Sequence, residues 1–215
     1  MGRLFAGPWM DVRGKVGNNV GRYVNGENIF AVKPHKSNKK PTLIQLNQQD
    51  VFGKVTSMVN GWKDLIAEGF RTGSSRQSPR NAAIEYNLEK AITGKAPNRV
   101  LDYSAFTFSR GSLPGAQNVK VINSLDDPYF LTFTWSKDSN DSEAKDTDFI
   151  NFMIHCPSTG RNTKLIKVVE RSALTLEMPI PFDYSGKQIE CYVNFMSTDG
   201  LKVSDSQYAG SLLKV

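Results

Sequence analysis

The residues best suited to acid–base chemistry are two histidines and two cysteines, and their positions argue against a catalytic site. His155 directly precedes Cys156 in an apolar, strand-like run. Adjacent side chains in a strand point to opposite faces, so this imidazole is not placed to activate this thiol. Cys191 lies in a second strand-like run, and His35 lies in a basic linker. We therefore expect both cysteines to be buried, unpaired apolar residues, and we predict no catalytic residue.

Two further patterns match ligand-binding motifs only in part. Gly14–Gly17 precedes a hairpin signal and lacks the Gly-Lys-Ser/Thr ending of a P-loop. In the loop 137–148, Asp138 and Asn140 alternate as in a calcium loop, but Glu143 stands where that loop needs glycine and the final glutamate is missing. We predict a solvated loop, and a protein that is not an enzyme and holds no metal and no cofactor.

The whole net charge of +6 lies in the first forty residues. They contain eight basic and two acidic side chains, whereas the 19 basic and 19 acidic side chains of the remaining chain cancel. Such asymmetry indicates an arm or patch that meets an acidic partner, such as nucleic acid, an acidic protein surface or anionic lipid, or else a solvated basic face. The candidate contact residues are Arg3, Arg13, Lys15, Arg22, Tyr23, Lys33, Lys36, Lys39 and Lys40.

Nucleic acid has a chemical argument in its favour as the partner. Basic residues at 13, 15 and 22 interleave with Trp9, Tyr23 and Phe30. Phosphates need Lys and Arg, and unpaired bases stack on aromatic rings. No sequence signature of a known nucleic-acid-binding fold accompanies them, and aromatic residues of a hairpin also serve as core. Protein docking and nucleic-acid binding therefore both stay open.

The elements that must position these residues begin with a hairpin. Asn25 and Gly26 separate the β-prone runs 22–24 and 29–32, and a type I′ turn requires positive φ at both central residues. A basic linker, 33–41, follows.

Two helices are predicted after the linker. The first begins at Thr42, a suitable N-cap, and ends at Gly69, although two internal glycines weaken its continuity. The second begins at Ser78, which is followed by proline, and ends by Gly94. Small residues on its face suit close packing against the first helix.

From Val100 the chain changes to short β-rich runs, which predict an antiparallel β-sandwich. The fold class is therefore α+β, with an N-terminal β-hairpin and two helices followed by a C-terminal sandwich. The run Gln188–Tyr208 resembles, in pattern, the last hairpin of immunoglobulin-like and fibronectin type III domains. The predicted strands are Phe106–Ser109, Val119–Ile122, Tyr129–Trp135, Phe149–His155, Lys164–Val169, Leu174–Met178, Ile189–Met196 and Leu212–Val215.

Short motifs in both halves of the chain carry a family resemblance. They are Gly14–Asn18 (GKVGN), Val20–Gly21, Pro41–Thr42 with Gln45–Leu46, Tyr86–Leu88 with Ala91–Gly94, and Leu101–Tyr103 with Ser109–Gly111. With these motifs the chain resembles a family of uncharacterised proteins of Bacteroidota, known as a domain of unknown function. Arg22 and Tyr23 follow the glycines here, and the tryptophan associated with the hairpin is absent. The resemblance implies no activity.

These observations predict two domains, residues 1–98 with the basic hairpin and helical pair and residues 99–215 with the immunoglobulin-like sandwich. We expect a non-catalytic structural or assembly protein, such as a virion or surface-assembly component, that docks through its basic N-terminal region; the alternative is a nucleic-acid-binding protein using the same region. The expected partners are further copies of itself or other protein subunits. No apolar run spans a bilayer and no signal peptide is recognisable, so we expect cytoplasmic synthesis, followed by incorporation into a virion or larger assembly.

Overall fold

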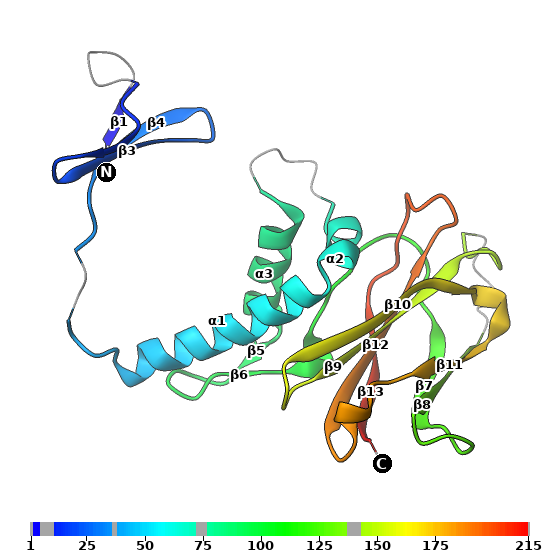
Figure 1. Ribbon diagram of the computed structural model, residues 1–215. Coiled ribbons are helices and arrows are strands. Elements are labelled where there is room, and N and C mark those ends of the chain that lie inside the picture. Colours follow the sequence, from blue (N-terminus) through cyan, green and yellow to red (C-terminus); the bar gives the residue numbers. More distant parts are fainter. Residues whose placement is uncertain (1, 5–10, 36–37, 72–76, 137–142, 215) are drawn as a thin grey trace. The chain divides into compact units, whose positions relative to one another are not determined.

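The computed structural model describes residues 2–4, 11–35, 38–71, 77–136 and 143–214 (Figure 1). The chain divides into two compact units, Met1–Pro41 and Thr42–Val215. The predicted α+β class is confirmed, because an N-terminal sheet is followed by helices and then by antiparallel sheets. The domain boundary predicted between residues 98 and 99 falls inside the second unit and stays a prediction.

The N-terminal unit is a small antiparallel sheet with the strand order β1-β4-β3-β2. The predicted hairpin is formed by β3 and β4, and Asn25 and Gly26 have φ of 50° and 84°, the positive values that a type I′ turn requires. The flanking strands were not predicted, because each has only three residues and shows no alternation. The bounds are β1 Gly2–Leu4, β2 Gly14–Val16, β3 Asn19–Val24 and β4 Glu27–Val32.

The second unit begins with helices, whose predicted starts are confirmed. The Thr42 hydroxyl accepts a hydrogen bond from the Gln45 backbone N–H while the Gln45 side chain accepts from the Thr42 N–H, a complete capping box. Ser78 caps the later helix in the same position, with proline at its first turn. The described helices are α1 Leu43–Gly61, α2 Lys63–Gly69 and α3 Pro79–Lys90.

The single helix predicted over residues 42–69 is two helices, α1 and α2, separated at Trp62. The helix continues through Gly53 but stops at Gly61, where a Cβ atom would lie 2.0 Å from the Asn162 amide nitrogen on a neighbouring strand. Trp62 leaves helical geometry with φ of −115° and is fully buried. The break therefore lets the helical layer approach the sheet closely and inserts the indole into the core between them.

Two antiparallel sheets form the rest of the second unit. One has the strand order β10-β9-β12-β13 and the other β11-β8-β7, and a short hairpin, β5 with β6, joins α3 to them. The bounds are β5 Ile92–Thr93, β6 Val100–Leu101, β7 Gln117–Asn123, β8 Phe130–Ser136, β9 Phe149–Cys156, β10 Arg161–Glu170, β11 Thr175–Pro179, β12 Gln188–Met196 and β13 Gln207–Leu213.

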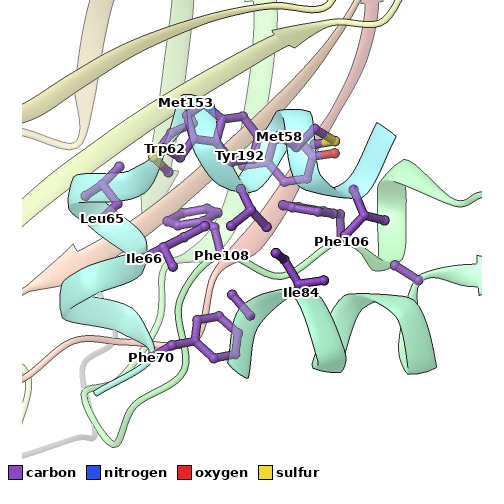
Figure 2. Packing of buried hydrophobic residues seen from close by; sticks show 14 of the residues in the cluster. Met58, Trp62, Leu65, Ile66, Phe70, Ile84, Phe106, Phe108, Met153 and Tyr192 are labelled. Carbon is purple, nitrogen blue, oxygen red and sulfur yellow. The ribbon is translucent and has the colours of Figure 1, made fainter. Parts of the chain in front are cut away.

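The central strands β9 and β12 are buried on both faces, which creates three layers. On one face Phe152 packs against Phe133 of the second sheet, with ring centres 4.8 Å apart. On the other face Met153 and Tyr192 pack against the helices around Trp62, as Figure 2 shows. The four-stranded sheet is thus the middle layer, with the helices on one side and the three-stranded sheet on the other (Figure 1).

Most predicted strands are observed, and three details are corrected. Residues 106–109 form no strand; Phe106 and Phe108 are buried in the helical core, and the Asn87 side chain binds both backbone groups of Thr107 at 2.6 and 2.7 Å. That side chain takes the place of a neighbouring strand. The last strand lies earlier than predicted, as β13, and residue 215 is outside the described range. Gly94 has a positive φ of 83°, but it turns the β5–β6 connection, because α3 already ends at Lys90.

Candidate docking surface on the N-terminal sheet

The register of the N-terminal sheet brings two of the predicted contact residues onto one face. Lys15 lies opposite Val20, which lies opposite Ala31. Two residues further along β3, Arg22 lies opposite Ile29. Opposite residues, and residues two apart in one strand, share a face of a sheet. We call the set Lys15, Val20, Arg22, Ile29 and Ala31 the cationic face: its two cations are exposed and its three apolar side chains are half-buried. Val24 and its partner Glu27 continue the same face beyond Arg22.

The opposite face of the same sheet holds Arg13 and Tyr23. The Arg13 guanidinium lies 4.9 Å from the centre of the Tyr23 ring and donates a hydrogen bond to the Asn28 side chain. Tyr23 and Asn28 are cross-strand neighbours, so the arginine lies across both strands of the hairpin. Arg13 and Tyr23 are therefore not part of the cationic face, although the sequence groups them with Lys15 and Arg22.

The remaining predicted contact residues are spread along the chain. The backbone of Arg3, in β1, pairs with Ile29 of β4. The Arg3 side chain lies outside the described residues, as do Lys36 and the predicted stacking residue Trp9. The Lys33 N–H donates to the Asn18 carbonyl at 2.8 Å, which closes the end of the sheet. The side chains of Lys33, Lys39 and Lys40 are exposed in the segment that leads to α1.

The N-terminal sheet buries no apolar side chain among its described residues. Among the side chains that the structure describes, the buried hydrophobic residues begin at Val51, in α1. In the sheet, Val32 is 61% exposed, Tyr23 56% and Val24 41%. Lys15 and Arg22 are exposed, and Glu27 is the acidic residue of this face. Of the three exposed apolar side chains, Val24 lies on the cationic face, whereas Tyr23 and Val32 lie on the opposite face.

His155 and Cys156 have the arrangement predicted from their sequence. The His155 ring lies in the helical core, 5.5 Å from the Tyr103 ring, and its Nδ1 is 2.8 Å from the Asn162 Oδ1. Burial lowers the pKa of His155, against the opposite effects of Asn162 and Glu190. Cys156 belongs to the core between the sheets, and Cys156 and Cys191 are both buried and free. The two faces of β9 separate the imidazole from the thiol.

A buried polar cluster that the sequence did not predict surrounds Glu190 on β12. Its carboxylate accepts hydrogen bonds from the Tyr208 hydroxyl at 2.5 Å, from Gln188 at 3.1 Å and from Ser211 at 3.2 Å. Burial, followed by the hydrogen bond and charge of Glu190, raises the pKa of Tyr208. The hydrogen bonds from Tyr208 and Ser211 join β12 to β13. Its signal in the sequence was a charged residue in a strand whose other side chains are uncharged.

The calcium-like loop lies partly outside the described residues, and its interpretation as a solvated loop stays a prediction. Asp138 and Asn140 lie outside the described residues. Glu143 pairs with Lys202 at 2.7 Å, and the buried Asp148 pairs with Arg171 at 3.5 Å. Within the described ranges, no group of three or more His, Cys, Asp or Glu side chains is arranged to hold a metal ion. None of the helices there has the length and apolar character needed to cross a bilayer.

The fold and this surface define an α+β protein that carries a small basic sheet ahead of a layered body of helices and antiparallel sheets. A family model covers residues 11–210, and it describes a family of unknown function, DUF6266. The chain belongs to this family, which agrees with the resemblance to an uncharacterised domain family found in the sequence. No curated protein matches the chain.

Proposed function

We propose that the protein is a non-catalytic structural or assembly component that docks on an acidic partner surface through the cationic face of its N-terminal sheet. The observation that carries this proposal is a sheet that buries no apolar side chain among its described residues. Small sheets need a covered apolar face for stability, and domains of about forty residues usually need a partner or a cross-link. A partner that covers the cationic face supplies what the sheet lacks.

The composition of the cationic face specifies the chemistry of that partner. Val20, Ile29 and Ala31 form an apolar centre, and Lys15 and Arg22 stand beside it. Interfaces commonly combine an apolar centre with charged residues at the rim, which steer the encounter. A partner with an apolar patch ringed by Asp and Glu fits best, on another copy of the chain or on a different subunit of the same assembly.

The finer parts of the family resemblance belong to this proposal. We infer an immunoglobulin-like or fibronectin type III-like body, a Bacteroidota family marked by the GKVGN motif, cytoplasmic synthesis, and incorporation into a virion or surface assembly. The strand order supports the immunoglobulin-like inference. Counting from β7, the first, second and fifth strands (β7, β8 and β11) form one sheet, and the other four (β9, β10, β12 and β13) form the second sheet. Such sandwiches serve as spacer or adhesive modules, although fold alone does not determine function.

Nucleic acid is the alternative partner, and the shared face of Lys15 and Arg22 favours it because two cations on one face can follow a phosphate backbone. The stacking part of this alternative is weaker. Tyr23 is exposed, but it lies on the opposite face, where Arg13 covers one side of its ring. The alternative therefore predicts binding that depends on salt and little on base identity.

The test compares the full chain with Lys15→Glu/Arg22→Glu. The control, Lys95→Glu/Lys120→Glu, makes the same change in net charge at two exposed lysines of the second unit. After nuclease treatment of a native extract from cells that make the protein, we expect the wild type and the control to elute in a large assembly, and the double variant to elute outside that assembly. Elution of the wild type as a single chain contradicts the proposal.

A fluorescent single-stranded DNA oligonucleotide, added to the purified proteins at low and high salt, tests the alternative. Salt-sensitive binding by the wild type and the control, lost in the double variant, together with loss of the assembly after nuclease treatment, identifies nucleic acid as the partner. An assembly that survives nuclease treatment, without oligonucleotide binding, excludes it.

A further inference from the structure

We propose that the first two turns of α1, residues 43–50, are a self-association surface on which a second copy of the chain docks its own α1 in antiparallel orientation. This surface belongs to the second unit and does not rest on the function proposed for the cationic face. Three properties of these turns carry the inference: exposed leucines on a rigid helix, the absence of charge, and the position of Asp50.

The first two turns are rigid and expose leucine side chains. Leu43 is 73% exposed and Leu46 47%, and the buried residues of α1 begin only at Val51. The capping box at Thr42 nevertheless holds the helix to its first residue. The Asn47 side chain also binds both the carbonyl and the N–H of Arg99, at 2.9 and 3.0 Å, which ties this part of α1 to the β5–β6 connection. Because the leucines stand on an ordered helix, a partner covers them without having to order the chain first.

The exposed leucines line one side of the helix. Leu43, Leu46 and Asp50 are spaced three and four residues apart, which places them in one stripe. Gly53 continues the stripe, and a Cβ atom at this position would meet nothing within 4 Å, so the surface beyond Asp50 is open. The stripe is long enough and clear enough for a second helix to lie along it.

The charge pattern indicates that this second helix is α1 of another copy. Residues 43–49 contain no charged side chain, although 22% of the chain is charged. In a symmetric contact each residue near the twofold axis meets its own counterpart, so a charge there would face a like charge. An uncharged centre suits self-association. A basic or an acidic partner would instead favour side chains of the opposite charge on this surface.

Asp50 provides complementarity away from the axis. The first turn of α1 contains no acidic residue to offset the positive end of the helix dipole. We place Leu46 of each copy nearest the twofold axis of an antiparallel helix pair. Asp50 of one copy and the first turn of the other helix then both lie about 6 Å from Leu46, measured along the helices. Asp50 pairs with Lys54 of its own helix at 2.8 Å but is half exposed, so each copy also offers this carboxylate to the first turn of the other helix.

The test uses the full chain carrying Leu46→Glu or Leu46→Lys, followed by sedimentation equilibrium over a concentration series. We expect the wild type to associate into dimers, and each variant alone to associate at least about tenfold more weakly, because like charges meet at the axis. An equal mixture of the two variants should recover association, since glutamate then faces lysine. Asp50→Asn should weaken association by a smaller factor.

Matched controls are Leu125→Glu and Leu125→Lys, which place the same charges at a leucine that is 94% exposed on the β7–β8 turn, far from α1 in Figure 1. These controls should associate like the wild type. A wild type that stays monomeric, Leu46 variants that associate normally, or a mixture that does not recover would each overturn the proposal. The same measurement on Lys15→Glu/Arg22→Glu separates the two surfaces, because pairing through α1 persists when docking through the cationic face is lost.

Discussion

The two units of this protein use their apolar residues in opposite ways. In the second unit, β9 and β12 are buried on both faces, and aromatic side chains fill the core on either side. In the N-terminal sheet, no described apolar side chain is buried. The first forty residues, which include this sheet, carry the whole net charge of +6. Burial of apolar area drives folding, so the described core of the second unit stabilises it by its own contacts, whereas the described residues of the N-terminal sheet supply no such core.

The largest expected effect is in the core between the two sheets. Phe152→Ala removes a fully buried ring that packs on Phe133 and on Trp135, and we expect the free energy of unfolding to fall by about 3–5 kcal/mol. Urea denaturation followed by tryptophan fluorescence measures it. The control, Leu125→Ala, removes an exposed side chain and should change stability by less than about 0.5 kcal/mol. Equal losses in the two variants would contradict the layered core described here.

A pH effect on the second unit should follow from His155. Burial keeps its pKa in the folded protein below the ordinary value of 6.5, so protonation favours the unfolded chain. The stability contributed by the neutral imidazole is present above pH 6.5 and is lost as the pH falls through the folded pKa. We expect the wild type to lose more stability than His155→Gln between about pH 7 and pH 5, measured by urea denaturation at each pH. Parallel pH curves for the two proteins would show that His155 protonates equally in both states.

A smaller effect is expected at the junction between the two units. Thr42→Ala removes the hydroxyl that caps α1 and should cost about 1 kcal/mol. Thr42→Ser keeps the acceptor and serves as the control. Hydrogen exchange should show faster exchange at the first amides of α1 in the alanine variant and unchanged protection in the serine variant. Unaltered exchange in both variants would mean that contacts of Asn47 alone hold these turns.

The smallest effect on stability should come from the N-terminal sheet. A substitution there tests most directly whether its apolar residues contribute less to stability than those of the second unit. Tyr23→Ala removes an exposed ring beside Arg13, and we expect the urea unfolding transition of the second unit to shift by less than about 0.5 kcal/mol. Tyr184→Ala is the matched variant in the body, where the ring is buried and its hydroxyl lies 3.0 Å from the Thr163 hydroxyl, and it should cost about 3 kcal/mol or more. A large shift for Tyr23→Ala would show that the two regions do not differ as described.

The accuracy of the sequence predictions follows the range of the interactions involved. The type I′ turn at Asn25 and the caps at Thr42 and Ser78 depend on neighbouring residues, and all three are confirmed. The break at Trp62 was missed because it depends on packing against β10, which is distant in sequence. For the same reason Phe106 and Phe108 were predicted as strand residues, although side-chain contacts from Asn87 hold that segment in place of a strand.

The candidate site shows the same division. Counting charged residues along the sequence located the net charge in the first forty residues, because this count needs no knowledge of the fold. Only the register of the sheet separated Lys15 and Arg22, which share a face, from Arg13 and Tyr23 on the other. By itself the sequence determined the turns, the caps, the strand-rich second half and the place of the charge, which are local or additive properties. The tertiary structure decided which side chains are covered and which stay exposed, because burial depends on contacts between residues far apart in the chain.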